Sequence, residues 1–165
     1  MNKRPLFFLL VLSILAGCAP VIPRETLQTV DRAITFKAVM DEPEGFIDAT
    51  VLFGGAIISI ENQGGSTVIE VMQQPLNRRL RPVKPGESAG RFLAVFNGFK
   101  DPAIYLPGRF LTIAGKVKAP HIQNIGKMPY RYPVIETIDH HLWSTPEYTG
   151  PAFGIGLGFG IVEGR

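Results

Sequence analysis

With 165 residues, 45% of them hydrophobic and 19% charged, the chain can bury the core of one domain, and its composition argues against wholesale disorder. The formal net charge is +3. Lys3 and Arg4 supply two of these positive units, so removal of the first seventeen residues would leave little excess charge to attract nucleic acid. The single cysteine excludes an internal disulfide.

The first eighteen residues have the order of a bacterial lipoprotein signal. Two basic residues precede an uncharged apolar run, Pro5 to Ala16, which is shorter than the ~20 residues of a membrane-spanning helix. The run ends in a signal-peptidase motif of Leu15, Ala16, Gly17 and Cys18. We predict that residues 1–17 are removed and that Cys18 carries a diacylglycerol on its thiol and an acyl chain, such as palmitate, on its amino group. The alternative is an ordinary signal peptide, or a buried helix with an incidental cysteine.

Residues 18–30 are predicted to be a lipidated tether. Pro20 and Pro23 lie close to the lipid, and a helix over 24–30 would be short. Ala19 follows the cysteine. Because enteric bacteria retain lipoproteins in the inner membrane mainly when aspartate stands there, Ala19 favours the outer membrane, with the domain on its periplasmic face.

Residues 31–145 are expected to form one all-β domain. Segments rich in β-branched and apolar residues, bounded by turn residues, predict strands at 48–62, 66–74, 90–99, 109–119 and 130–143. Gly54 and Gly55 would let the first strand bend through both halves of a barrel. The interior would include Val51, Ile58, Val71, Leu93, Val95, Ile113 and Val134.

This pattern favours a small five- to six-stranded Greek-key, OB-like barrel over a β-sandwich. Such a barrel needs a long first strand that can curl, and the glycine pair supplies the bend. A helix between the third and fourth strands is missing from the pattern, because residues 100–106 would form at most one turn.

The signal-peptidase motif is followed by distinctive stretches at 53–62, 67–82 ("TVIEVMQQPLNRRLRP"), 90–117, 125–136 and 141–143. In this order they resemble the Slp family of outer-membrane lipoproteins, over nearly the whole chain up to Trp143. The resemblance implies a small lipoprotein of Gram-negative bacteria, associated with starvation and stationary phase in the family's namesake. It implies no enzymatic activity and supplies no catalytic residues.

The densest positive stretch is "NRRLRPVK", residues 77–84. Export would remove nucleic acid as a partner, which leaves the phosphates and carboxylates of the cell envelope, and arginine holds phosphate by paired hydrogen bonds. The candidate anion contacts are Arg78, Arg79, Arg81 and Lys84. The alternative is a solvated loop that charge keeps soluble.

No arrangement of residues predicts catalysis or a metal. His140 and His141 are adjacent in a strand and should point to opposite faces, so they would not share one ion. The sequence contains no G-x-S-x-G elbow, Walker loop or dinucleotide fingerprint. We therefore predict no catalytic residue, no metal and no cofactor apart from the lipid on Cys18.

Residues 146–165 form a tail in which bulky apolar residues alternate with glycine. As a strand, the tail would have one apolar face and one bare face, which suits contact with a membrane, a partner protein or a second copy of the chain. The residues concerned are Phe153, Ile155, Leu157, Phe159 and Ile161. The alternative is a flexible tail that lies across the barrel.

These observations predict a non-enzymatic outer-membrane lipoprotein that acts as an envelope binding or scaffold module. The lipid would attach the protein to the membrane. An envelope protein or a second copy of the chain would bind the tail, and nucleic acid would not be a partner. The alternative is a periplasmic protein that binds a small ligand, or an anionic glycan or lipid, through the barrel face and residues 77–84.

Overall fold

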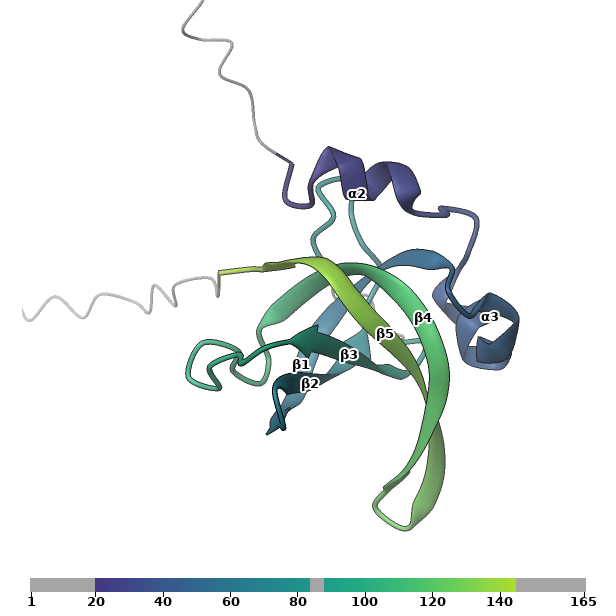
Figure 1. The fold of residues 1–165 in the computed structure, drawn as a ribbon, viewed down its shortest axis with the longest axis vertical. Coiled ribbons are helices and arrows are strands. Elements are labelled where there is room, and N and C mark those ends of the chain that lie inside the picture. Colours follow the sequence, from purple (N-terminus) through teal and green to yellow (C-terminus); the bar gives the residue numbers. More distant parts are fainter. Residues whose placement is uncertain (1–19, 84–87, 145–165) are drawn as a thin grey trace, which may run out of the picture.

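Five strands close into one barrel (Figure 1). The computed structural model describes residues 20–83 and 88–144. The strands are β1 (Thr50–Gln63), β2 (Ser66–Gln73), β3 (Arg91–Asn97), β4 (Phe110–Ile125) and β5 (Met128–Leu142). Their order is β1-β2-β3-β5-β4, with β4 returning to β1, and among these five strands each pair is antiparallel except β3 with β5. This is the strand order of an OB-fold, so the predicted all-β, OB-like barrel is confirmed.

β1 takes part in both halves of the barrel because two adjacent glycines let it bend. Gly55 faces Gln73 of β2 and also Leu111 of β4. A side chain at Gly55 would overlap the carbonyl oxygen of Met72, and a Cβ at Gly54 would lie 2.7 Å from the carbonyl oxygen of Leu111. The close approach of these backbones therefore requires glycine, as the predicted bend does.

β4 and β5 form a longer hairpin than the sequence predicts. They run to Ile125 and from Met128, whereas we expected strands at 109–119 and 130–143. In the described part of the chain, their ends beyond residue 118 pair only with each other, and Figure 1 shows this ribbon projecting from the barrel. Pro120 and Pro129 argue against a central strand, but a two-stranded ribbon tolerates them because its edges are free.

The barrel interior is only partly as predicted. Val51, Val71 and Ile113 are fully buried, and they pack with a core that also contains Ile57, Ile69, Phe92, Ala94, Leu111 and Ile135. The predicted interior residues Ile58, Leu93, Val95 and Val134 are wrong, because they are only partly buried. β3 carries apolar residues on both faces, so alternation along its sequence does not reveal which face turns inward; a shift of one residue exchanges the two faces.

A short helix covers one end of the barrel. Between residue 20 and β1, the structure has three helical segments: α2 (Arg24–Thr29), α3 (Phe36–Asp41) and the 3-10 helix η1 (Pro43–Phe46). Phe36 of α3 lies with its ring centre 5.2 Å from that of Phe53 and 5.7 Å from that of Phe92. Thr35 caps α3 by accepting a hydrogen bond from the amide of Ala38, at 3.2 Å. Apolar cover at this end thus comes from α3, while turns connect β3 to β4.

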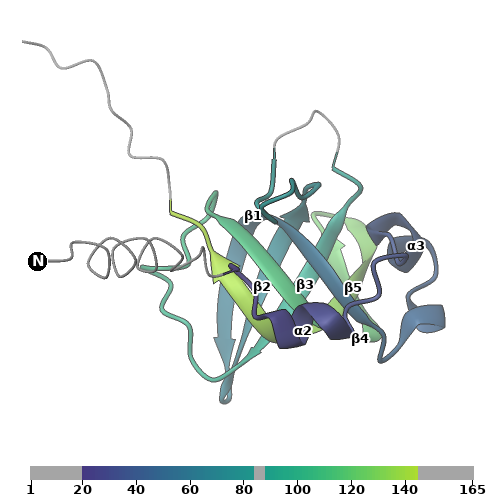
Figure 2. The same cartoon turned by 90° about the horizontal axis from the view of Figure 1, so that it is seen from above.

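The segment expected as a tether packs on the barrel from its fifth residue onward. Ile22 is fully buried, and the Thr26 hydroxyl donates a hydrogen bond to the carboxylate of Asp139 on β5. Figure 2 shows α2 lying against the strands. In the sequence, only residues 19–21 stand between Cys18 and the buried Ile22. In the described ranges, no helix is both long and apolar enough to cross a membrane.

Candidate anion-binding groove

A groove of about 700 Å³ separates the segment before α3 from the barrel wall. Its walls come from within residues 30–36, from Leu52 to Gly54 of β1, and from the end of β2 and the loop after it, within residues 73–80. Leu52, Phe53 and Leu76 contribute to an apolar lining. A smaller hollow of about 240 Å³ lies beside the first described residues. Arg32 and Arg78 line both spaces, so two cations stand where the groove and the hollow adjoin.

The loop that carries Arg78 is held in shape by its own hydrogen bonds. The side-chain oxygen of Asn77 accepts from the amides of Arg79 (2.8 Å) and Arg81 (3.1 Å). Leu80 adopts a left-handed conformation with φ +62°, and its carbonyl oxygen accepts a hydrogen bond of 2.7 Å from the hydroxyl of Thr112 on β4. These bonds fix the backbone of the loop against the barrel, and with it the positions from which its arginines extend.

The structure separates the predicted anion contacts. Arg78 and Arg79 are exposed beside the hollow, and neither forms an ion pair within the described ranges. The guanidinium of Arg81 instead lies over the rings of Trp143 (5.3 Å) and Phe110 (5.8 Å), where a cation–π contact holds it. Lys84 lies outside the described residues.

Arg32 also lines the groove, and the sequence pattern does not predict it as a site residue. It stands 46 positions before Arg78, and no local pattern connects the two residues. The neighbouring carboxylate of Asp31 also borders the groove, and it accepts a hydrogen bond of 2.9 Å from the amide of Ala33. Two guanidinium groups and one carboxylate therefore leave the groove with an excess of positive charge.

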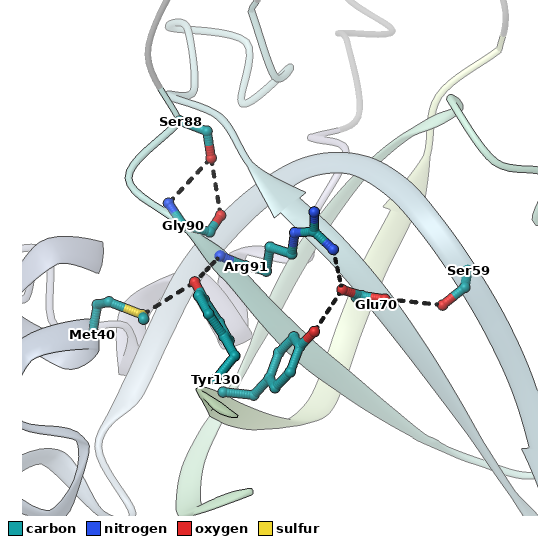
Figure 3. A network of polar contacts seen from close by, with 8 residues as sticks. Met40, Ser59, Glu70, Ser88, Gly90, Arg91 and Tyr130 are labelled. Carbon is teal, nitrogen blue, oxygen red and sulfur yellow. Dashed lines mark hydrogen bonds and ion pairs between the residues drawn. The ribbon is translucent and has the colours of Figure 1, made fainter. Parts of the chain in front are cut away.

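A second cluster of polar side chains lies where α3, β1, β2, β3 and β5 meet (Figure 3). The carboxylate of Glu70 accepts hydrogen bonds from Arg91 (3.0 Å), Tyr132 (2.8 Å) and Ser59 (3.2 Å). The Tyr130 hydroxyl accepts from the amide of Arg91 at 2.8 Å and donates to the sulfur of Met40 at 3.8 Å. These bonds join the strands to α3.

The polar groups of this cluster are hydrogen-bonded to one another, as in a network that supports the fold. Burial, followed by the hydrogen bond to Glu70, raises the pKa of Tyr132 to about 12, so this hydroxyl stays protonated and donates. The hydrogen bond with the same carboxylate raises the pKa of Arg91. Since Glu70 accepts three hydrogen bonds, it is committed to holding the strands rather than presented to a substrate.

The two adjacent histidines face different neighbours. His140 Nε2 lies 2.8 Å from the hydroxyl of Tyr105, whereas the ring of His141 lies 4.5 Å from that of Trp143. Burial lowers the pKa of both histidines, and Lys100 lowers that of His140 further. In the part of the chain that the structure covers, no three His, Cys, Asp or Glu side chains gather as metal ligands.

The remaining candidates lie outside the described residues. These are the signal-peptidase motif with Cys18, and the apolar residues of the tail, Phe153, Ile155, Leu157, Phe159 and Ile161. Their roles remain predictions.

Comparison with known proteins identifies one family. A family model described as "Outer membrane lipoprotein Slp family" matches residues 15–154. The uncharacterized lipoprotein YeaY of Escherichia coli K12 is 31% identical over 105 residues, which is 64% of this chain and 54% of that protein. The outer membrane protein Slp of the same organism is 27% identical over 157 residues, 94% of this chain and 83% of that one.

Two further similarities concern an uncharacterized protein and a solved structure. An uncharacterized protein of Haemophilus influenzae is 28% identical over 145 residues, 87% of this chain and 78% of that protein. Among solved structures, a small single-stranded DNA-binding protein from Streptomyces coelicolor gives a TM-score of 0.39 at 10% identity, and the match covers 58% of this chain and 94% of that one.

Proposed function

Because the chain belongs to the outer membrane lipoprotein Slp family, we propose that it is anchored to the outer membrane by a lipid on Cys18 and works there as a non-enzymatic binding module. The barrel lies on the periplasmic leaflet, and the groove takes an anionic lipid whose headgroup carries a phosphate. The observation that carries this proposal is the pair Arg32 and Arg78 at the junction of the two hollows, close to the start of the described chain.

The short path from the lipid to the groove supports this proposal. Cys18 stands two residues before Pro20, and two residues span at most ~7 Å. Pro20 lines the smaller hollow together with Arg78 and Arg79. Three acyl chains at Cys18 would hold the protein at the bilayer permanently, since each buried methylene contributes ~0.8 kcal/mol. The arginines of the groove would therefore lie at the level of the lipid phosphates.

The composition of the groove fits an amphiphile rather than a free ion. Ligand sites usually combine an apolar lining with a few placed polar groups, and they occupy roughly 300–1,000 Å³. Here Leu52, Phe53 and Leu76 offer apolar surface to an acyl chain, while two guanidinium groups offer paired hydrogen bonds to a phosphate.

Replacement of Cys18 with alanine tests the anchor. We expect the variant to lose the mass of the acyl groups and to leave the outer-membrane fraction, because only a thiol can form the thioether. Intact-mass analysis and flotation of membranes measure both effects. Ser13→Ala, in the same apolar run, should be processed and retained normally. Acylated, membrane-bound material from the Cys18 variant would contradict the assignment.

Removal of both groove cations tests the site. In the chain from residue 18 with Cys18→Ser, we expect Arg32→Gln/Arg78→Gln to weaken binding of dihexanoylphosphatidylglycerol about tenfold or more, since hydrogen bonds to charged groups contribute ~1.5–3 kcal/mol. Titration calorimetry below the micelle concentration measures this affinity.

A matched double variant controls for net charge. Arg24 and Lys116 are exposed and line neither hollow, so Arg24→Gln/Lys116→Gln removes two positive charges elsewhere. It should bind as the unmodified chain does. Inorganic phosphate should bind more weakly than the lipid, because it leaves the apolar lining unfilled. Equal affinities for the two double variants would show that the groove is not the site.

A further inference from the structure

We propose that the loop between β3 and β4 (residues 98–109, the β3–β4 loop) is a second membrane contact, which enters the bilayer that holds the lipid of Cys18. This inference rests on the proposed anchor at Cys18. Three large apolar side chains of the loop are turned to solvent: Phe99 is 69% exposed, Ile104 51% and Leu106 49%. Such a cluster on one loop is costly in water and usually marks an interaction surface.

The loop cannot fold these side chains away, because hydrogen bonds fix its backbone. At its start, the Thr67 hydroxyl donates to the carbonyl of Gly98 (2.9 Å) and accepts from the amide of Lys100 (3.0 Å). In its middle, the carbonyl of Asp101 accepts from the amides of Ile104 (2.9 Å) and Tyr105 (3.0 Å).

Tyr105 is the inward-facing residue of the loop. It is only 9% exposed, and its ring packs against that of Phe96, with the centres 6.2 Å apart. Ile104 and Leu106 are its neighbours in the chain, so the burial of Tyr105 holds both of their side chains outward. The exposure of these two side chains is a consequence of the fold and does not require a mobile segment.

A series of contacts connects the β3–β4 loop to the hollow beside Pro20, the first described residue. Leu80 lines the hollow beside the first described residues, and its carbonyl accepts from Thr112. The Thr112 hydroxyl also accepts from the indole of Trp143 at 2.9 Å. The guanidinium of Arg109 then joins the carbonyl of Trp143 (2.9 Å) to that of Ile104 (2.6 Å).

The two ribbon views agree with this placement. In Figure 2 the purple start of the described chain, the yellow end of β5 and the β3–β4 loop all lie on the left side, while α3 lies on the right; in Figure 1 the start lies at the top, left of centre, and the loop lies lower at the left. A bilayer that meets the start of the chain therefore lies near the apolar side chains of this loop.

The charges of the β3–β4 loop also suit a bilayer surface. Lys100 and Arg109 flank Ile104 and Leu106 in the sequence, and Asp101 is the one carboxylate of the loop sequence. Its side chain accepts a hydrogen bond of 2.8 Å from the amide of Ala103. Apolar tips with cations at their base are the arrangement of segments that lie in the headgroup region of a membrane.

The tip of the β4–β5 hairpin provides a matched control. Ile122 and Met128 are also apolar, and at 67% and 74% exposed they are more accessible than Ile104 and Leu106. They belong to the ribbon that Figure 1 shows projecting away from the start of the chain. A general affinity of exposed apolar residues for lipid would affect both places, whereas an oriented contact affects the β3–β4 loop alone.

The test places an environment-sensitive fluorescent amino acid at Leu106 or at Met128 in the lipidated protein, reconstituted in vesicles of phosphatidylethanolamine and phosphatidylglycerol. We expect the probe at position 106 to shift to the blue and to be several-fold better shielded from aqueous iodide than the probe at position 128. Equal quenching at the two positions would overturn the proposal. Shielding that rises with protein density at constant lipid would indicate a second copy of the chain and would also overturn it.

A second preparation separates this inference from the anchor itself. The chain from residue 18 is coupled through its Cys18 thiol to a maleimide-headed lipid in the same vesicles, which fixes residue 18 at the bilayer by chemistry alone. Exposure of position 106 in this form overturns the loop contact. Absence of acyl mass on Cys18 in the native protein overturns the proposed function instead.

Discussion

Replacement of Gly55 with alanine is expected to destabilise the barrel by about 3 kcal/mol or more, because the added methyl group would overlap the carbonyl oxygen of Met72. The strain falls on backbone that is paired on both sides, since Gly55 faces Gln73 of β2 and Leu111 of β4. Neither strand can move outward without losing ladder hydrogen bonds. Urea unfolding of the chain from residue 18 measures the change as a lower midpoint.

Gly45→Ala provides the control for this result. The atoms nearest to a Cβ at Gly45 would belong to the side chain of Glu42, at 3.5 Å, which is ordinary contact. We expect its free energy of unfolding to stay within about 0.5 kcal/mol of the parent value. Equal, small effects of both substitutions would mean that β1 and β2 are further apart at Gly55 than the structure has them.

The second large effect is expected at Phe36, where truncation to alanine should cost about 3–5 kcal/mol. Phe36 is 6% exposed and packs edge-on against Phe53, so its removal leaves a void between α3 and the barrel. Phe36 and Phe53 also line the groove. The same variant should therefore bind dihexanoylphosphatidylglycerol less tightly, which calorimetry would measure alongside the unfolding midpoint.

Phe99→Ala is the control for Phe36→Ala, because it removes the same aromatic ring from a position where the ring is not packed. Phe99 is 69% exposed, and we expect its truncation to change the unfolding free energy by no more than about 0.5 kcal/mol. A cost at Phe36 as small as that at Phe99 would show that α3 does not cover the barrel end in solution. If Phe99→Ala leaves the free energy of unfolding unchanged, the side chain is not needed for stability, and its role can be measured by vesicle binding.

The fold was largely predictable because its strands carry strong local signals. β-Branched runs bounded by turn residues indicated all five strands, and Gly54-Gly55 indicated the bend of β1 that closes the barrel. What failed depended on pairing between distant residues. Leu93 and Val95 are as apolar as Phe92 and Ala94, so only the pairing of β3 with β2 and β5 decides which pair is buried.

The site was less predictable than the fold, for the same physical reason. Arg78 lies in a dense basic run, whereas Arg32 is an isolated residue that tertiary packing brings to the same groove. Arg81 belongs to the same run as Arg78, but Trp143 and Phe110 hold it. α3 has six residues, with Phe36 and Val39 as its buried residues, which is too short a pattern to indicate a helix that covers a barrel.

The burial of Ile22 has a consequence for binding energetics at the bilayer. A domain on a long flexible linker samples many orientations, and each contact with the membrane must then restrict that freedom. If the chain is anchored by a lipid on Cys18, as we propose, only three residues stand between that lipid and the buried Ile22, so the domain would have fewer orientations to lose. The groove and the β3–β4 loop would then meet lipid at a high effective concentration. Lipid contacts that are too weak to recruit the free domain to a membrane would therefore still form once the domain is anchored.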